Sequence, residues 1–135
     1  MAEKFLNYES YLCTLDGLLS IGYTNIMKDI VIYKTIDGKC PYTEWVESLS
    51  FEYQLRVYKR INKLKDGLKG DWKRLQNSNL SELRLDFGKG YRIYYKELND
   101  IVILLLAGSD KKNQAKAIKQ ASKYYEDFVE RNYKG

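Results

Sequence analysis

Four basic side chains lie in or directly after three β-type runs in the second half of the chain. Arg84 and Arg92 belong to the first two runs, and Lys111 and Lys112 follow the third. A guanidinium can bind a phosphate through two parallel hydrogen bonds, and an ammonium adds a compact positive charge. If the runs are neighbouring strands, several of these cations converge at one end of a sheet. Their types and spacing therefore predict a phosphate site suited to RNA chemistry.

Metal-free cleavage of RNA requires three things: removal of the 2′-hydroxyl proton, stabilisation of the charged phosphorane and protonation of the leaving 5′-oxygen. Histidine usually performs two of these steps, but the sequence contains none. The reaction would therefore use Lys, Arg, Tyr or a carboxylate, or depend on a partner to position the substrate. Without histidine, and with Cys13 and Cys40 widely separated, we expect no zinc site of the usual kind, no cofactor and two reduced thiols.

The three runs that carry the cations are predicted to form consecutive strands. Residues 81–87 alternate, residues 91–97 are aromatic and β-branched, and residues 101–107 form the continuous apolar run of a buried central strand. The connectors 88–90 and 98–100 contain Gly, Asn and Asp, which tolerate the backbone conformations of tight turns. Arg84 and Arg92 should therefore lie on adjacent antiparallel strands.

Elements upstream and downstream complete the predicted domain. Residues 30–35 have the composition of a strand, Thr43 can cap a short helix, and Ser50 can cap a longer one. The apolar stripe predicted for the longer helix contains Phe51, Leu55, Tyr58, Ile61, Leu64 and Leu68. Asp110 is a candidate N-cap for a last helix, whose predicted apolar face contains Ala115, Ile118, Ala121, Tyr125 and Phe128.

The element order is therefore β-α-α-β-β-β-α. This order predicts an α+β fold with a single twisted, mostly antiparallel sheet of about four strands. A helical hairpin and a C-terminal helix would pack on one face of that sheet. Residues 30–135 would form the domain, and residues 1–29 an N-terminal extension. The extension reads either as an amphipathic helix ending near Gly22 or as a segment upstream of a start at Met27.

The motifs of the cationic unit resemble the RelE/ParE-like toxins of bacterial type II toxin–antitoxin modules, and most closely the HigB-like addiction-module killer branch. The matching words are ELR at 82–84, FGKGYRIYY at 87–95 and GSDKKNQ at 108–114, in this order and separated by an apolar strand. The resemblance extends from about Ile30 to Phe128. It implies the same fold and, in members that act on RNA, cleavage of messenger RNA in the ribosomal decoding site by a cationic active site.

The resemblance assigns roles to the four cations. Arg92 matches a position that contacts the scissile phosphate, and Arg84 matches a cationic position on the preceding strand. Lys111 and Lys112 match the basic pair after the last strand, where RelE has an arginine as proposed general acid at the second position. A lysine crowded by cations lowers its pKa more readily than arginine does and can then give up a proton. The structural alternative for Arg92 is an ion pair with a neighbouring carboxylate, Glu82 or Asp86.

Two departures from RelE are visible in the sequence. Ile118 stands where RelE has a tyrosine in the last helix, and Glu82 stands near a lysine position. Tyr91, Tyr94 or Tyr124 could supply base stacking instead. Asp110 and Gln114 also have a structural interpretation, in which Asp110 caps the helix and Gln114 braces the turn.

A basic surface is predicted beside this site. The net charge is +5, and the excess of cations begins after residue 50. Basic side chains gather on the outer face of the longer helix and soon after it, as is typical of solvated helices, although the same face could track phosphates or contact ribosomal RNA. The RNA-binding residues predicted outside the four cations are Lys63, Lys73, Arg74, Lys89, Tyr91 and Tyr94.

These observations lead to one expected function and two alternatives. The expected function is a ribosome-dependent mRNA endonuclease toxin that inhibits translation, with the ribosome, messenger RNA and a cognate antitoxin as partners. A ParE-like toxin that binds and inhibits DNA gyrase without nuclease chemistry is the first alternative, and a non-catalytic nucleic-acid-binding or inert module is the second. The N-terminus shows no signal-peptide pattern and the sequence has no long apolar span, so the expected location is the cytoplasm, with no membrane contact.

Overall fold

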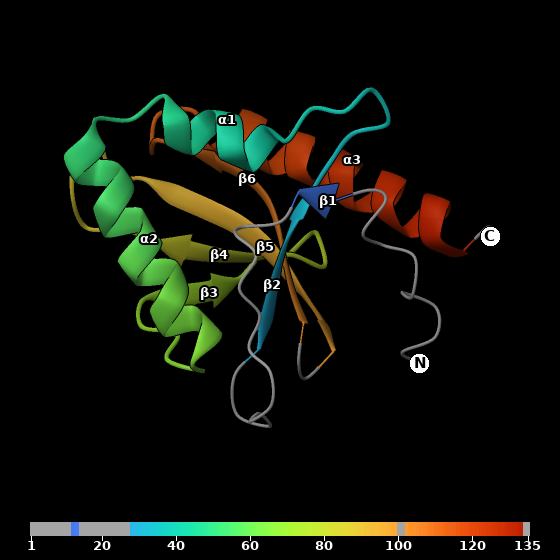
Figure 1. Cartoon of the computed structure of the whole chain (residues 1–135), viewed down its shortest axis with the longest axis horizontal. Coiled ribbons are helices and arrows are strands. Elements are labelled where there is room, and N and C mark those ends of the chain that lie inside the picture. Colours follow the sequence, from blue (N-terminus) through green and yellow to red (C-terminus); the bar gives the residue numbers. More distant parts are fainter. Residues whose placement is uncertain (1–11, 14–27, 100–101, 134–135) are drawn as a thin grey trace.

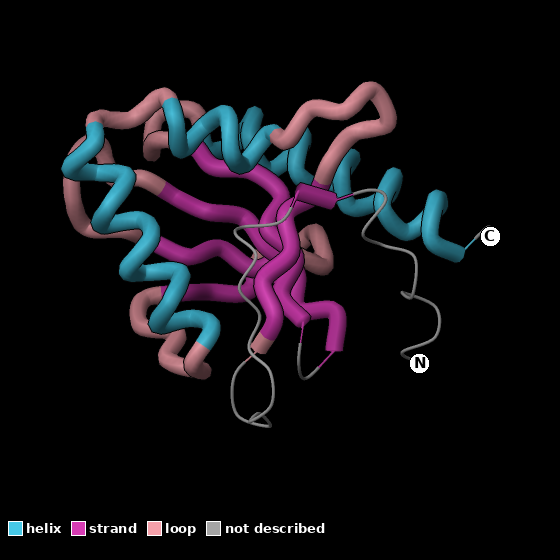
Figure 2. Tube along the Cα trace, viewed as in Figure 1, coloured by secondary structure: helices cyan, strands magenta, loops and turns pink. Residues whose placement is uncertain are grey.

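The computed structural model describes residues 12–13, 28–99 and 102–133, which form a sheet flanked by three helices (Figure 1). The strands form one twisted sheet (Figure 2). Their order in the sheet is β1-β2-β6-β5-β4-β3. Four of its neighbouring pairs are antiparallel, and β2 runs parallel to β6. The elements are β1 (Leu12–Cys13), β2 (Asp29–Tyr33), α1 (Pro41–Glu47), α2 (Phe51–Lys65), β3 (Trp72–Arg74), β4 (Ser81–Arg84), β5 (Arg92–Asn99), β6 (Val102–Ser109) and α3 (Gln114–Tyr133).

The α+β class agrees with the prediction, whereas the number of strands and the element order differ. The sheet has six strands instead of about four, because β1 and β3 were not predicted. Strand β3 is short and all three of its residues are exposed, and it lacks the apolar alternation that marks a half-buried strand in sequence. The helix predicted near the N-terminus is wrong at Leu12–Cys13, which form a strand. The rest of that prediction lies outside the described residues.

The helices cover both faces of the sheet, so the prediction that they share one face is wrong. Leu104 and Leu106 of β6 pack with Phe128 of α3. The alternate residues Ile103 and Leu105 pack with the residues of α1 and α2. Strand β6 is buried on both faces because it lies centrally in the sheet, between β2 and β5.

The N-terminal ends of the helices depend on local side chains. Ser50 caps α2, since its hydroxyl accepts a hydrogen bond from the Tyr53 N–H, as predicted. Helix α1 instead begins at Pro41, so the predicted cap at Thr43 is wrong. Proline is favoured in the first turn because that turn needs no backbone N–H donor.

Cys40, just before α1, is disulfide-bonded, so the prediction of a reduced thiol is wrong at this position. Spacing along a sequence does not show which thiols the fold brings together.

The apolar stripe predicted for α2 is divided between core and surface. Ile61 and Leu64 are buried together with Val57, whereas Phe51 is 73% exposed. The other predicted stripe residues that are exposed are Leu55, Tyr58 and Leu68. The phase of the buried face is set by how the helix meets the sheet, which the spacing of apolar residues alone did not determine. Helix α2 therefore presents apolar side chains on its outer surface.

Glu97 of β5 ties two lysines from distant parts of the chain to the sheet. Its carboxylate oxygens lie 3.4 Å from the Lys28 ammonium and 3.1 Å from that of Lys69. Burial by itself would raise the pKa of Glu97, but the hydrogen bonds and positive charges of Lys69 and Lys28 outweigh it, and the pKa is lowered.

We therefore expect Glu97→Gln to lower the free energy of unfolding by about 1 kcal/mol at neutral pH. A lowered folded-state pKa stabilises the fold above the unfolded-state pKa, and this contribution is lost as the pH falls through the folded-state value. Urea unfolding of both proteins over a series of pH values checks the prediction. The difference should shrink in acid, whereas a difference independent of pH would contradict it.

Candidate functional site

A buried carboxylate lies at the centre of the cationic unit. Glu82 of β4 has no exposed surface, and its carboxylate lies 3.3 Å from Arg84 Nε and 3.9 Å from Arg92 Nε. The side-chain amide of Gln114, the first residue of α3, also donates a hydrogen bond to Glu82. A buried carboxylate is tolerated only when it is paired and hydrogen-bonded. Glu82 therefore orients two arginines and the start of α3 at once.

Strand register places the two arginines next to each other. Arg84 and Arg92 lie on adjacent antiparallel strands, as predicted, and the structure shows that they are direct partners in the β4–β5 ladder, with Arg92 opposite Ser109 of β6. All three residues thus lie in one row across three strands. This row lies on the face of the sheet that α3 covers. Tyr94, two positions after Arg92 and therefore on the same face, belongs to the core that contains Phe128 of α3.

Arg92 is held firmly by the protein. Its side chain is 13% exposed, and Nη1 donates hydrogen bonds to the carbonyl oxygens of Gly90 at 3.2 Å and Tyr91 at 3.3 Å. Its Nε is buried without a hydrogen bond, at ion-pair distance from Glu82. The ion pair with Glu82 is therefore present, as the structural interpretation of Arg92 predicted. A guanidinium held this way is preorganised, and a phosphate would reach only its exposed edge.

Arg84 is more accessible than Arg92. Its side chain is 35% exposed and makes a second, longer ion pair with Asp71 at 3.8 Å. Asp71 is itself largely exposed, so this contact is screened by solvent. Arg84 can therefore exchange Asp71 for an anionic ligand while its contact with Glu82 remains in place.

The turn at 88–90 brings Lys111 to the same end of the sheet. The Lys111 N–H donates to the Lys89 carbonyl at 3.2 Å. Gly90 adopts φ +70°, and a Cβ there would lie 3.4 Å from Cβ of Lys111 and 3.9 Å from Nη1 of Arg92. Both lysines are exposed, as is Lys112 in the turn before α3. Arg84, Arg92 and the backbone of Lys111 therefore lie at the same end of the sheet, as predicted. Lys112 lies on the surface of the turn before α3.

Two of the three tyrosines considered for base stacking, Tyr91 and Tyr94, are buried. Tyr94 has no exposed surface, and its hydroxyl lies 3.1 Å from the Ser109 hydroxyl. Burial raises the pKa of Tyr94 to about 12, so this phenol keeps its proton at neutral pH. The ring of Tyr91 is packed edge-on against the rings of Trp45, Tyr53 and Phe87. Neither Tyr91 nor Tyr94 has a free ring face for a base.

The GSDKKNQ motif has structural roles that differ in part from those predicted. Asp110 is not the N-cap of α3, because the helix begins at Gln114; its Oδ1 instead accepts a hydrogen bond from the Asn113 N–H at 2.9 Å within the turn that precedes the helix. Gln114 braces the site through Glu82. Ile118 of α3 packs against the core. The position of Glu82, two residues before Arg84, indicated that it could form an ion pair with an arginine of the site. Its complete burial was not predicted.

A basic groove of about 730 Å³ lies between α2 and the β3–β4 edge. Arg84 lines its end, so the groove borders the arginine site. Arg60 has a structural role here, since its Nη2 donates to the carbonyl oxygens of Lys69 and Asp71. Lys73 and Arg74, also predicted to bind RNA, are exposed on the edge strand β3. The other basic residues that line the groove are Arg56, Lys59, Lys63 and Lys69.

Comparisons with known proteins identify one relative. The chain is 40% identical over 81 residues to an uncharacterized protein from Haemophilus influenzae, and the matched region covers 59% of this chain and 81% of the relative. No protein-family model matches the chain. Among the described residues, none of the helices has the length and apolar character needed to cross a membrane.

Proposed function

We propose that this chain, which belongs to the same family as the Haemophilus influenzae protein, is the toxin of a type II toxin–antitoxin module and cleaves messenger RNA on the ribosome. The observation that carries the proposal is the adjacent pair Arg84 and Arg92, both oriented by the buried Glu82. Two fixed guanidinium groups side by side suit a phosphate that gains negative charge during a reaction. The resemblance to the RelE/ParE-like toxins supplies the substrate.

The reaction is an in-line attack of a 2′-oxygen on the adjacent phosphorus. The bond from phosphorus to the 5′-oxygen breaks, leaving a 2′,3′-cyclic phosphate and a free 5′-hydroxyl. Arg92 and Arg84 stabilise the charge on the phosphorane, and the positive charge of Arg84 favours ionisation of the 2′-hydroxyl, whose proton passes to solvent water. Lys112 or Lys111, on the turn beside them, protonates the leaving oxygen. Because the site has no histidine, it depends on the ribosome to align the substrate.

The partners follow from the charge of the surface. The groove between α2 and the β3–β4 edge contains six basic side chains and the two carboxylates Asp71 and Asp86. Such a surface is complementary to ribosomal RNA during catalysis and to an acidic segment of the antitoxin during neutralisation. The cytoplasm is the compartment in which these partners meet.

Removal of the attacking group tests the chemistry. A ribosome-bound mRNA whose target nucleotide carries a 2′-hydrogen instead of a 2′-hydroxyl should not be cleaved, while the all-ribose message is cut. Quantifying the product on a sequencing gel gives both rates. Cleavage of the deoxy-substituted message at an unchanged rate would contradict the mechanism.

A second candidate is a toxin that acts by binding a protein such as DNA gyrase. It is favoured by the apolar side chains that α2 exposes: Phe51, Leu55 and Tyr58, spaced by four and three residues on one side of the helix. Under this function, Leu55→Asp should abolish growth arrest and Arg92→Gln should preserve it. The nuclease function predicts loss of arrest with Arg92→Gln, so the pair of variants separates the two candidates.

A further inference from the structure

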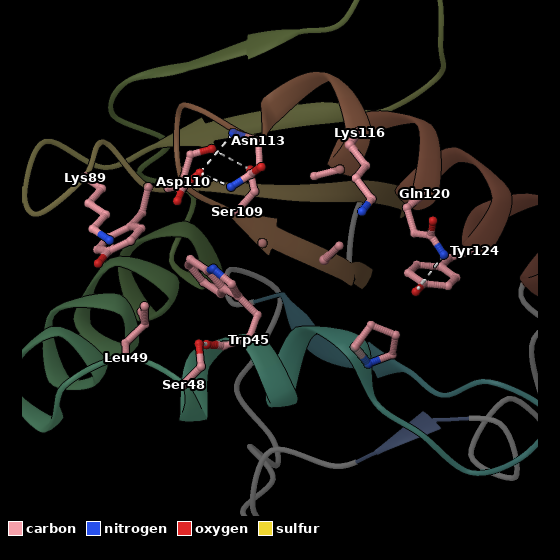
Figure 3. Close-up of a pocket in the computed structure, with 15 residues that line it drawn as sticks. Trp45, Ser48, Leu49, Lys89, Ser109, Asp110, Asn113, Lys116, Gln120 and Tyr124 are labelled. Carbon is pink, nitrogen blue, oxygen red and sulfur yellow. Dashed lines mark hydrogen bonds between the residues drawn. The ribbon is translucent and has the colours of Figure 1, made fainter.

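A second cleft, separate from the basic groove, opens between α1 and α3. It has a volume of about 550 Å³ and crosses the end of β6 at Ala107–Ser109. Figure 3 shows Trp45 of α1, with Ser48 and Leu49 directly after the helix, on one side, and Lys116, Gln120 and Tyr124 of α3 on the other. Lys89, from the turn before β5, closes one end. A volume of this size is typical of pockets for small molecules.

The aromatic part of the cleft is fixed by close packing around Trp45. A Cβ placed on Gly108 would lie only 2.2 Å from the indole ring, so this ring rests directly on the strand backbone. Tyr91 contacts the same indole at a centroid distance of 5.8 Å. Within the described part of the chain, the indole N–H of Trp45 donates no hydrogen bond, so this donor remains available to a ligand. The wall is therefore rigid, aromatic and provided with a donor.

The polar part of the cleft is basic. Lys89 and Lys116 are exposed at its rim. Asp110 is the one carboxylate among the lining residues, and its Oδ1 already accepts hydrogen bonds from the Asn113 backbone N–H at 2.9 Å and side-chain amide at 2.8 Å. The Gln120 amide donates to the Tyr124 hydroxyl at 3.2 Å. The net charge presented to a ligand is therefore positive, and side-chain amides and a hydroxyl also line the cleft.

We propose that this cleft binds a nucleotide, with the base against Trp45 and the phosphate near Lys89 and Lys116. An aromatic wall favours a planar base, while the two ammonium groups favour an anion, and a nucleotide combines both in one molecule. A free phosphate would use only the lysines, and an uncharged aromatic molecule only the wall. The inference goes beyond mRNA cleavage, because nucleotide binding here does not require Arg84 or Arg92 to act on a phosphodiester.

Fluorescence of Trp45 measures the binding directly. The chain has two tryptophans, and Trp72→Phe removes the other one, which is partly exposed on the edge strand. In this background, adenosine 5′-monophosphate should change the fluorescence in a saturable way. Adenosine and inorganic phosphate should each bind at least about tenfold more weakly, because each lacks one of the two interactions. Equal affinities for the nucleotide and for inorganic phosphate would show that the cleft binds anions without recognising the base, and would overturn the proposal.

Lysine variants locate the ligand. Lys89→Ala and Lys116→Ala together should weaken nucleotide binding by about tenfold or more. Lys119→Ala is the matched control, since Lys119 is exposed on α3 but does not line the cleft. Equal affinities for the double variant and the control would overturn the proposal, as would the absence of saturable binding at millimolar nucleotide. Arg92→Gln, which should strongly reduce the rate of mRNA cleavage, should leave nucleotide binding intact, so failure of either proposal is distinguishable from failure of the other.

Discussion

Glu82→Ala should lower the free energy of unfolding by about 3–5 kcal/mol, the largest stability loss expected from any substitution at the arginine site. Glu82 is fully buried and contacts Arg84, Arg92 and Gln114. Its removal leaves the buried Nε of Arg92 without a counter-charge and the Gln114 amide without its acceptor. Equilibrium unfolding in urea, monitored by circular dichroism, measures the loss.

Asp71→Ala is the matched control for this prediction. Asp71 also forms an ion pair with Arg84, but it is largely exposed and lies 3.8 Å away, so its loss should cost less than about 1 kcal/mol. Both substitutions delete one carboxylate paired with Arg84. The difference between their effects on the free energy of unfolding therefore measures the contribution of the burial of Glu82. Equal effects would show that Glu82 does not organise the site.

Arg92→Gln should reduce the rate of ribosome-dependent mRNA cleavage by about 10²–10³-fold, the loss typical of removing one group that stabilises transition-state charge. Glutamine keeps a hydrogen-bond donor near the carbonyl oxygens of Gly90 and Tyr91 but carries no positive charge. The rate is measured on ribosomes stalled with a defined codon in the decoding site, at saturating toxin.

The control for Arg92→Gln must separate charge from stability. Lys39→Gln removes one positive charge from an exposed loop and should leave the rate unchanged. Unfolding of the Arg92 variant is measured alongside, and rates are compared only at temperatures at which the variant is fully folded. A folded Arg92→Gln protein that cleaves at the wild-type rate would rule out Arg92 as a catalytic residue.

The parts of the fold that follow a local rule were predictable from the sequence. The glycine-containing connector and the alternating runs predicted that β4 and β5 are adjacent antiparallel strands carrying Arg84 and Arg92, and the structure adds that these two residues are direct partners. The connector predicted at 98–100 is wrong in part, because β5 extends through Asn99. Ser50 also acts as the cap that its position indicated. These features depend on residues close together in the chain.

The features that were missed depend on contacts between distant segments. The continuous apolar run of β6 already indicated burial on both faces, and this should have predicted helices on both sides of the sheet. The burial of Tyr91 and Tyr94 depends on how α1 and α3 pack, and the link from Glu82 to Gln114 spans 32 residues. No periodicity within one element encodes such contacts.

The most direct test of the central claim is induced expression in bacteria of the wild-type chain and of Arg92→Gln, with new mRNA 5′ ends mapped by primer extension while growth is followed. We expect growth arrest together with cuts at codon-related positions, and loss of both in the variant. Growth arrest without new 5′ ends, to the same extent in the variant, would contradict the nuclease account.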